Sequence, residues 1–105
     1  MADVSSLVEA MRERADTLKE LGYKVRFDLT DTGEAILLDA TGAAAEVSGA
    51  AGEDEADAVL KLSTDTLDKL ITGRIGPMLA FSTGRLKISG SQGVALKLAG
   101  LLDQA

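Results

Sequence analysis

The chain has no cysteine and no histidine, and among its 105 residues it has one proline, two phenylalanines, one tyrosine and no tryptophan. Without cysteine there is no disulfide, thiolate metal site or thiol nucleophile, and without histidine there is no imidazole base. Serine and threonine hydroxyls are present, but no histidine is available to activate them. We therefore expect no enzyme, no catalytic residue, no cofactor and no metal site.

Charge is unevenly balanced, because 17 acidic residues outnumber 11 basic ones and the net charge is −6. The basic residues form no evident cluster, so we expect neither nucleic acid nor an anionic membrane to bind by charge. No run approaches the roughly 20 apolar residues of a membrane span, and no secretory pattern opens the chain. These features predict a cytoplasmic protein without stable membrane insertion.

The composition, 46% apolar and 27% charged, is typical of a folded globular protein. A chain of this length builds one hydrophobic core, so residues 1–105 are expected to form a single domain. The most polar stretch contains Glu53, Asp54 and Glu55. Because these carboxylates lack the spacing of a calcium-binding loop, we interpret residues 49–57 as a solvated loop.

The N-terminal region has apolar residues at helical spacing, which predicts an amphipathic helix over residues 5–21. Ser5 or Ser6 is the expected N-cap, and Gly22 the residue that ends the helix.

Alternation of apolar and polar residues follows, and it predicts a strand over residues 23–30. The positions expected to point inward are Tyr23, Val25, Phe27 and Leu29. Two further strands, over residues 34–40 and 43–49, are separated by turn sequences. Together these segments predict an antiparallel meander.

The C-terminal half begins with a strand over residues 56–63, followed by a helix capped by Ser63 and ended by Gly73. A fifth strand is expected over 85–89 and a final helix over 91–104. Helices at both ends of a strand-rich middle indicate the α+β class.

The segment Pro77–Gly90, PMLAFSTGRLKISG, has two interpretations. Its apolar start, expected as a turn or the first turn of a helix, is either ordinary core or the wall of a cavity for an apolar ligand. Leu96 lies opposite the main apolar face of the final helix, which is therefore more apolar than a surface helix requires.

This C-terminal half resembles the sterol carrier protein 2 (SCP2) domain. The resemblance rests on an Ala-Phe pair, Ala80 and Phe81, followed by the strand GRLKISG and the helix GVALKLAGLL. It is specific over residues 56–102 and compatible with the rest of the chain. After Phe81, Ser82 and Thr83 are more polar than the bulky residue often found there in the family. Ser91 stands where the family commonly has an acidic or amide residue. These departures bear on ligand preference.

The resemblance implies a five-stranded, mostly antiparallel sheet with helices covering one face around an apolar tunnel. It also implies a stand-alone domain of bacterial type that binds fatty acids, fatty acyl-CoA or sterol-like lipids without catalysis. The chain's last residues do not form a Ser-Lys-Leu signal, so peroxisomal targeting is not expected. The expected ligand-binding residues are Leu67, Leu70, Ile71, Ile75, Met78, Leu79, Phe81, Val94, Leu98, Leu101 and Leu102.

Two functions remain open at this stage. The first is binding, and also transfer, of one apolar lipid by a monomer or weak dimer, with the final helix as a moving cover. The second is an accessory domain that packs against a partner enzyme through that helix.

Overall fold

The computed structural model describes residues 4–50 and 56–103, and it contains a five-stranded sheet in the order β3-β2-β1-β4-β5. The strands are β1 (Lys24–Leu29), β2 (Ala35–Asp39), β3 (Glu46–Ala50), β4 (Ala58–Leu62) and β5 (Lys87–Gly90). All neighbours pair antiparallel except β1 and β4, which are parallel. The predicted meander of the first three strands is confirmed.

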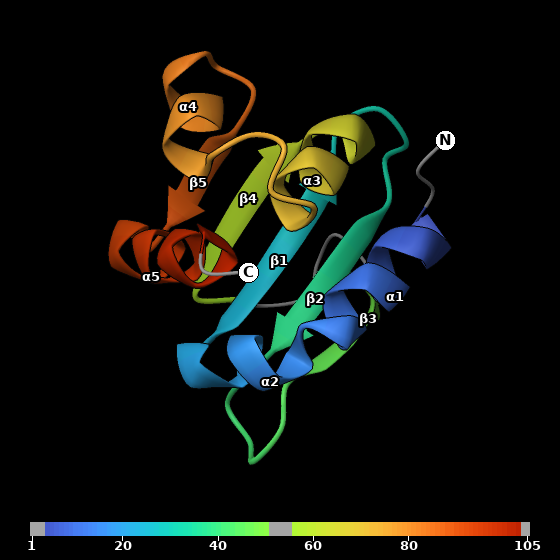
Figure 1. Ribbon diagram of the computed structural model, residues 1–105, viewed down its shortest axis with the longest axis vertical. Coiled ribbons are helices and arrows are strands. Elements are labelled where there is room, and N and C mark those ends of the chain that lie inside the picture. The colour runs from blue at the N-terminus through green and yellow to red at the C-terminus, as the bar shows by residue number, and fades with distance from the viewer. Residues whose placement is uncertain (1–3, 51–55, 104–105) are drawn as a thin grey trace.

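The helices lie on one face of this sheet, as the resemblance implied (Figure 1). They are α1 (Val4–Glu13), α2 (Ala15–Leu18), the 3-10 turn η1 (Lys19–Leu21), α3 (Thr64–Ile71), α4 (Pro77–Ser82) and α5 (Gln92–Asp103). Helices α1 and α2 cover the β1–β3 side, α5 crosses the β4–β5 side, and α4 stands near the start of β5 (Figure 1).

The core lies between the sheet and the helices, because strand side chains alternate between the two faces. Val25, Phe27 and Leu29 of β1 are buried beneath the helices, and so are the alternate residues of β4. The intervening positions of β1 are only partly buried, and there Arg26 Nε donates to Asp28 Oδ1 at 2.8 Å.

Three local expectations were wrong. Helix α1 already includes Ser5 and Ser6, so neither is its N-cap. The expected single helix is interrupted at Arg14, whose ψ of 14° departs from the helical value, and it finishes in η1; the expected end at Gly22, which has a φ of 76°, is confirmed. Tyr23 is 43% exposed rather than inward, because it precedes β1 and its ring lies 5.6 Å from the Lys97 ammonium.

Other expectations were right. The Ser63 hydroxyl accepts from the Thr66 amide and begins α3, and Gly73, after α3, has a positive φ of 76°. The apolar start of the Pro77–Gly90 segment forms α4, with Pro77 in its first turn.

The solvated loop expected over residues 49–57 stays a prediction, because Glu53, Asp54 and Glu55 lie outside the described residues.

Asp57 joins three parts of the fold. Its backbone amide donates to the Lys24 carbonyl at 2.9 Å, and its carboxylate accepts from the Lys24 amide at 2.9 Å. Its carbonyl accepts from the Ser91 amide, also at 2.9 Å. The start of β1, the start of β4 and the link from β5 to α5 therefore meet at one residue.

Gly90 is required at this junction for two reasons. Its φ of +80° lies in the left-handed region, and an added Cβ would stand 2.8 Å from the Asp57 carbonyl oxygen. A backbone oxygen cannot move aside as a flexible side chain does. The turn that sets the direction of α5 therefore needs a residue without a Cβ.

We predict that Gly90→Ala lowers the free energy of unfolding by more than about 1–2 kcal/mol, because the clash adds to the cost of the positive φ. Denaturant titration measures this loss. Gly49→Ala is the matched control, since Gly49 lies in β3 with open space around it and no positive φ. Equal stability of the two variants would contradict this account of Gly90.

Asp31 ties the turn after β1 to the start of α3. Its carboxylate accepts from the Thr64 amide at 3.1 Å and from the Thr64 hydroxyl. The hydrogen bonds from Thr64, led by the hydroxyl, lower the pKa of Asp31 because they stabilise the charged carboxylate.

A lowered pKa in the folded state means that the Asp31 carboxylate contributes stability above its ordinary value of about 3.9. That contribution is lost as the pH falls below about 4 and through the lowered folded value. Asp31→Asn should therefore destabilise the protein at neutral pH and flatten its acid unfolding profile. Thermal melts of both proteins from neutral pH to the acid limit test this, and parallel profiles would contradict it.

Candidate functional site

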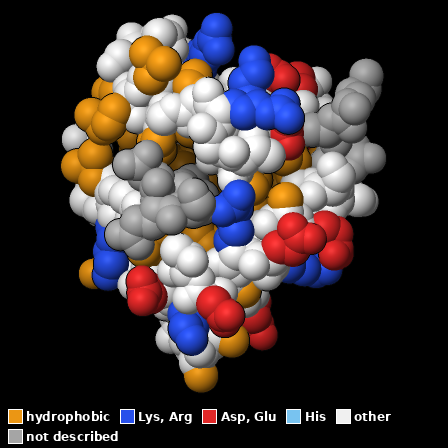
Figure 2. Space-filling view, viewed as in Figure 1, with side chains coloured by type: hydrophobic (Ala, Val, Ile, Leu, Met, Phe, Trp, Pro, Cys, Tyr) orange, Lys and Arg blue, Asp and Glu red, His pale blue; other side chains and the backbone are white. Residues whose placement is uncertain are grey.

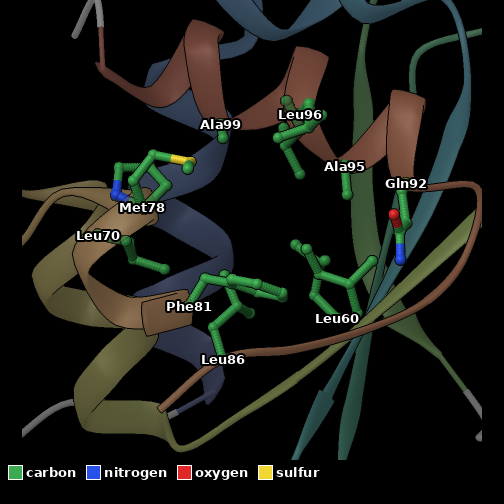
Figure 3. Close-up of a pocket in the computed structure, with 12 residues that line it drawn as sticks. Leu60, Leu70, Met78, Phe81, Leu86, Gln92, Ala95, Leu96 and Ala99 are labelled. Atoms are coloured by element: carbon green, nitrogen blue, oxygen red, sulfur yellow. The ribbon is translucent and has the colours of Figure 1, made fainter. Parts of the chain in front are cut away.

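An apolar hollow lies between α4 and α5, over β4 and β5 (Figure 3). It encloses about 670 Å³ of empty space, its open mouth included. Five elements and the residues beside them supply its walls: β4, α3, α4, β5 and α5. The lining residues are Leu60, Leu70, Pro77, Met78, Phe81, Leu86, Ile88, Gln92, Ala95, Leu96, Leu98 and Ala99.

Helix α5 leaves room for this hollow because two of its facing residues are small. Ala95 and Ala99 are four residues apart, so they lie on one side of the helix, and both line the hollow. In Figure 3 they stand above Phe81 and Leu86, with open space between the two sets. Val94, Leu98 and Leu101 hold α5 against the core from an adjoining side.

Helix α4 stands away from the core, and this decides which apolar residues are exposed. Of its residues only Ala80 is buried. Met78 is 62% exposed and Phe81 49%, although both line the hollow. Leu96 of α5, which lines it too, is 57% exposed. Large apolar side chains are thus held in contact with water around an apolar hollow, which is unfavourable unless a partner covers them.

The hollow has almost no polarity. Of the residues that the structure describes, Gln92 is the single polar residue that lines it, and no charged side chain does. In Figure 3 Gln92 lies at one end and Met78 at the other. Among the described residues no group of acidic side chains is arranged to hold a metal ion. The lining offers apolar contact and one amide, and no pair of groups suited to acid-base chemistry.

A second hollow adjoins the first and shares four of its lining residues, Pro77, Met78, Leu96 and Ala99. Gly76 and Gly100 complete its wall. Met78 has an unbranched, flexible side chain. A rotamer change at Met78 or Leu96 would therefore alter the boundary between the two hollows.

Four of the residues expected from the sequence line the hollow, namely Leu70, Met78, Phe81 and Leu98. Four others are buried in the core away from it: Leu67, Ile71, Val94 and Leu101. Ile75 packs partly buried against the core, and Leu79 is exposed without lining either hollow. The Leu102 side chain lies outside the described residues.

The sequence-based selection missed eight lining residues. They are Leu60 of β4, Pro77 of α4, Leu86 just before β5, Ile88 of β5, and Gln92, Ala95, Leu96 and Ala99 of α5. Alternation does place Leu86 and Ile88 on one face of their strand, and the isolated position of Leu96 indicated an unusual surface. No pattern in the sequence marked Ala95 and Ala99 as the residues that leave space.

The chain resembles known proteins over nearly all of its length. The sequence model of the SCP-2 sterol transfer family matches residues 4–103. Hydroxysteroid dehydrogenase-like protein 2 from Bos taurus is 32% identical over 90 residues, which cover 85% of this chain and 22% of that protein. This chain therefore corresponds to about a fifth of that relative's length.

Two solved structures share the fold. The sterol carrier protein domain 2 of Helicoverpa armigera superposes with a TM-score of 0.72 at 28% identity, covering 93% of this chain and 80% of that one. Palmitated SCP2L2 from Aedes aegypti superposes with a TM-score of 0.76 at 17% identity, covering 96% and 95%.

The two sides of α5 should respond differently to truncation. Leu98 is 0% exposed, so Leu98→Ala should lower the free energy of unfolding by about 2–5 kcal/mol. Leu96→Ala, on the exposed side, should change it by less than about 0.5 kcal/mol. Urea titration of both variants measures the difference. Similar losses would mean that Leu96 is packed in solution and that the hollow is closed there.

Proposed function

Because the chain belongs to the SCP-2 sterol transfer family, we propose that the hollow between α4 and α5 binds the apolar body of a lipid and that the domain is a non-catalytic carrier. The ligand classes are fatty acids, fatty acyl-CoA and sterol-like molecules. Palmitated SCP2L2 from Aedes aegypti has the same fold, and this supports fatty acyl chains as a ligand class.

One observation carries the proposal: Met78, Phe81 and Leu96 are largely exposed and line an uncharged hollow. In a core these side chains would be buried, and on an ordinary surface they would be scattered. Their convergence favours the cavity-wall interpretation of the Pro77–Gly90 segment.

The hydrophobic effect alone supplies enough affinity. Each buried methylene contributes about 0.8 kcal/mol, so a sixteen-carbon chain gains on the order of 10 kcal/mol before the costs of ordering. Specific polar recognition is therefore unnecessary, and one methylene more or less changes affinity little. We propose a site that tolerates several apolar ligands.

Gln92 suggests how the ligand is oriented in the hollow. Its amide both donates and accepts hydrogen bonds, so it suits a hydroxyl, ester or carboxylate oxygen. We place the polar end of the ligand at Gln92 and its apolar end towards Met78, across the hollow in Figure 3.

A second function, an accessory domain that packs against a partner enzyme through α5, is favoured by one observation. The Bos taurus relative is about five times longer than the region it shares with this chain. This function predicts that α5 binds protein, and it needs no lipid.

Filling the hollow tests lipid binding. We expect native mass spectrometry of gently purified protein to show a lipid, and a fluorescent fatty acyl probe to bind with one-to-one saturation. Ala99→Phe should weaken that binding at least about tenfold, since a phenyl ring would occupy space lost to the ligand. Ala43→Phe, at an exposed turn position, is the matched control.

Saturable binding that survives Ala99→Phe would place the ligand elsewhere. Absence of any saturable binding by the unaltered protein would overturn the carrier function. The accessory function would then be pursued by searching for a protein partner of α5.

A further inference from the structure

Charge is segregated along the chain in a way that the net value conceals. Residues 70–102 contain no aspartate or glutamate and four basic residues, Arg74, Arg85, Lys87 and Lys97. Since the whole chain carries −6 and this segment +4, the remainder carries −10. The segment that supplies α4 and α5 is therefore cationic within an acidic protein.

Two of these cations flank the exposed apolar residues. Arg74 precedes α4 and Arg85 follows it, and both are exposed. Neither guanidinium has a carboxylate within ion-pair distance among the described residues. The Lys97 ammonium instead lies 5.6 Å from the Tyr23 ring. Lys87 alternates with Leu86 and Ile88 and so faces away from the hollow.

Leu79 adds an apolar group that the lipid site does not use. It is 56% exposed and lines neither hollow, whereas its neighbour Met78 lines both. Figure 2 shows apolar side chains gathered over α4 and α5, without acidic side chains among them. We call the surface formed by Arg74, Met78, Leu79, Phe81, Arg85 and Leu96 the rim face.

We propose that the rim face docks on the surface of a membrane containing anionic phospholipid. The apolar side chains would enter the boundary between headgroups and acyl chains, and the guanidinium groups would meet the phosphates. Among the described helices, none has the length and apolarity needed to cross a bilayer, so the contact is peripheral.

The net negative charge does not prevent this contact, contrary to the expectation from the sequence. The Debye length is about 10 Å at 0.1 M salt, whereas the protein extends 33 × 26 × 25 Å. Acidic groups on the far side are therefore screened from the bilayer, and the charge of the docking face decides the interaction. That face carries Arg74 and Arg85 and lies in the segment without acidic residues.

Docking would place the mouth of the hollow against the bilayer, because Met78, Phe81 and Leu96 belong to both surfaces. The docking itself does not depend on lipid occupying the hollow. A protein partner or a second copy of this chain could also cover an apolar surface. Neither accounts as directly as anionic phosphate for two arginines that form no ion pair within residues 4–50 and 56–103.

The test is cosedimentation of the full chain with phosphatidylcholine vesicles prepared with and without phosphatidylserine, at 0.1 M salt. We expect binding to the anionic vesicles that weakens at high salt. Leu79→Glu should reduce it by roughly tenfold or more, since a charge replaces an apolar group that docking would bury in the bilayer. Arg74→Gln and Arg85→Gln should each reduce it about fivefold.

Two controls match these changes away from the rim face. Ala43→Glu adds the same negative charge in the turn between β2 and β3, and Lys19→Gln removes an exposed cation in η1. Both should bind vesicles like the unaltered protein. All variants should still bind the fatty acyl probe in the absence of vesicles, which separates this proposal from the lipid site.

Failure of the unaltered protein to bind anionic vesicles, or equal losses in the control variants, would overturn membrane docking by this surface. A concentration-dependent dimer that Leu79→Glu abolishes, found together with no vesicle binding, would instead assign the rim face to self-association. Vesicle binding without probe binding would leave the docking proposal standing and reject the lipid site.

Discussion

The hydrogen bonds of Asp57 determine where the C-terminal helix can lie. One residue joins the start of β1, the start of β4 and the amide that follows β5, and Gly90 makes the close approach possible. Helix α5 therefore starts from a fixed point and crosses the sheet in a fixed direction. Its larger apolar residues then pack on the core, while Ala95 and Ala99 face α4 across unfilled space. The hollow follows from where α5 begins and from which residues it presents.

Helix α4 differs from α5 because its large apolar side chains do not pack on the core. Its only buried residue is Ala80, whose carbonyl accepts from the Arg85 and Leu86 amides at 2.9 and 3.2 Å as the chain turns back into β5. The helix is thus positioned by its backbone, and its large side chains are left for other contacts. These side chains are therefore available for the proposed ligand and membrane contacts, because the core does not need them for stability.

Much of the fold could be predicted from the sequence because alternation and helical spacing report which side of an element is buried. Phe27 and Leu29 were found in this way, and Ser63 and Gly73 marked the ends of α3 correctly. The break at Arg14 and the exposure of Tyr23 could not be predicted, since both depend on how the N-terminal helices reach the sheet. Fewer residues of the candidate site than of the core could be predicted from the sequence. Leu67 and Leu70 share a helix face, yet only Leu70 lines the hollow, because the separation of α4 from α5 is a tertiary property.

The single parallel strand pair has a consequence for how the molecule folds. The β1–β2 and β2–β3 pairings join neighbours in the chain, so they can form early and locally. The β1–β4 pairing joins residues such as Val25 and Ala58, and it requires the chain to return from the outer strand to the centre of the sheet. Closing so long a loop costs entropy before any contact compensates for it, which makes this step slow. Until it is complete, β1 has an open edge and the C-terminal half has no sheet to cover. During synthesis the nascent chain would present that edge before β4 has emerged, so this is the stage at which pairing with another chain competes with folding.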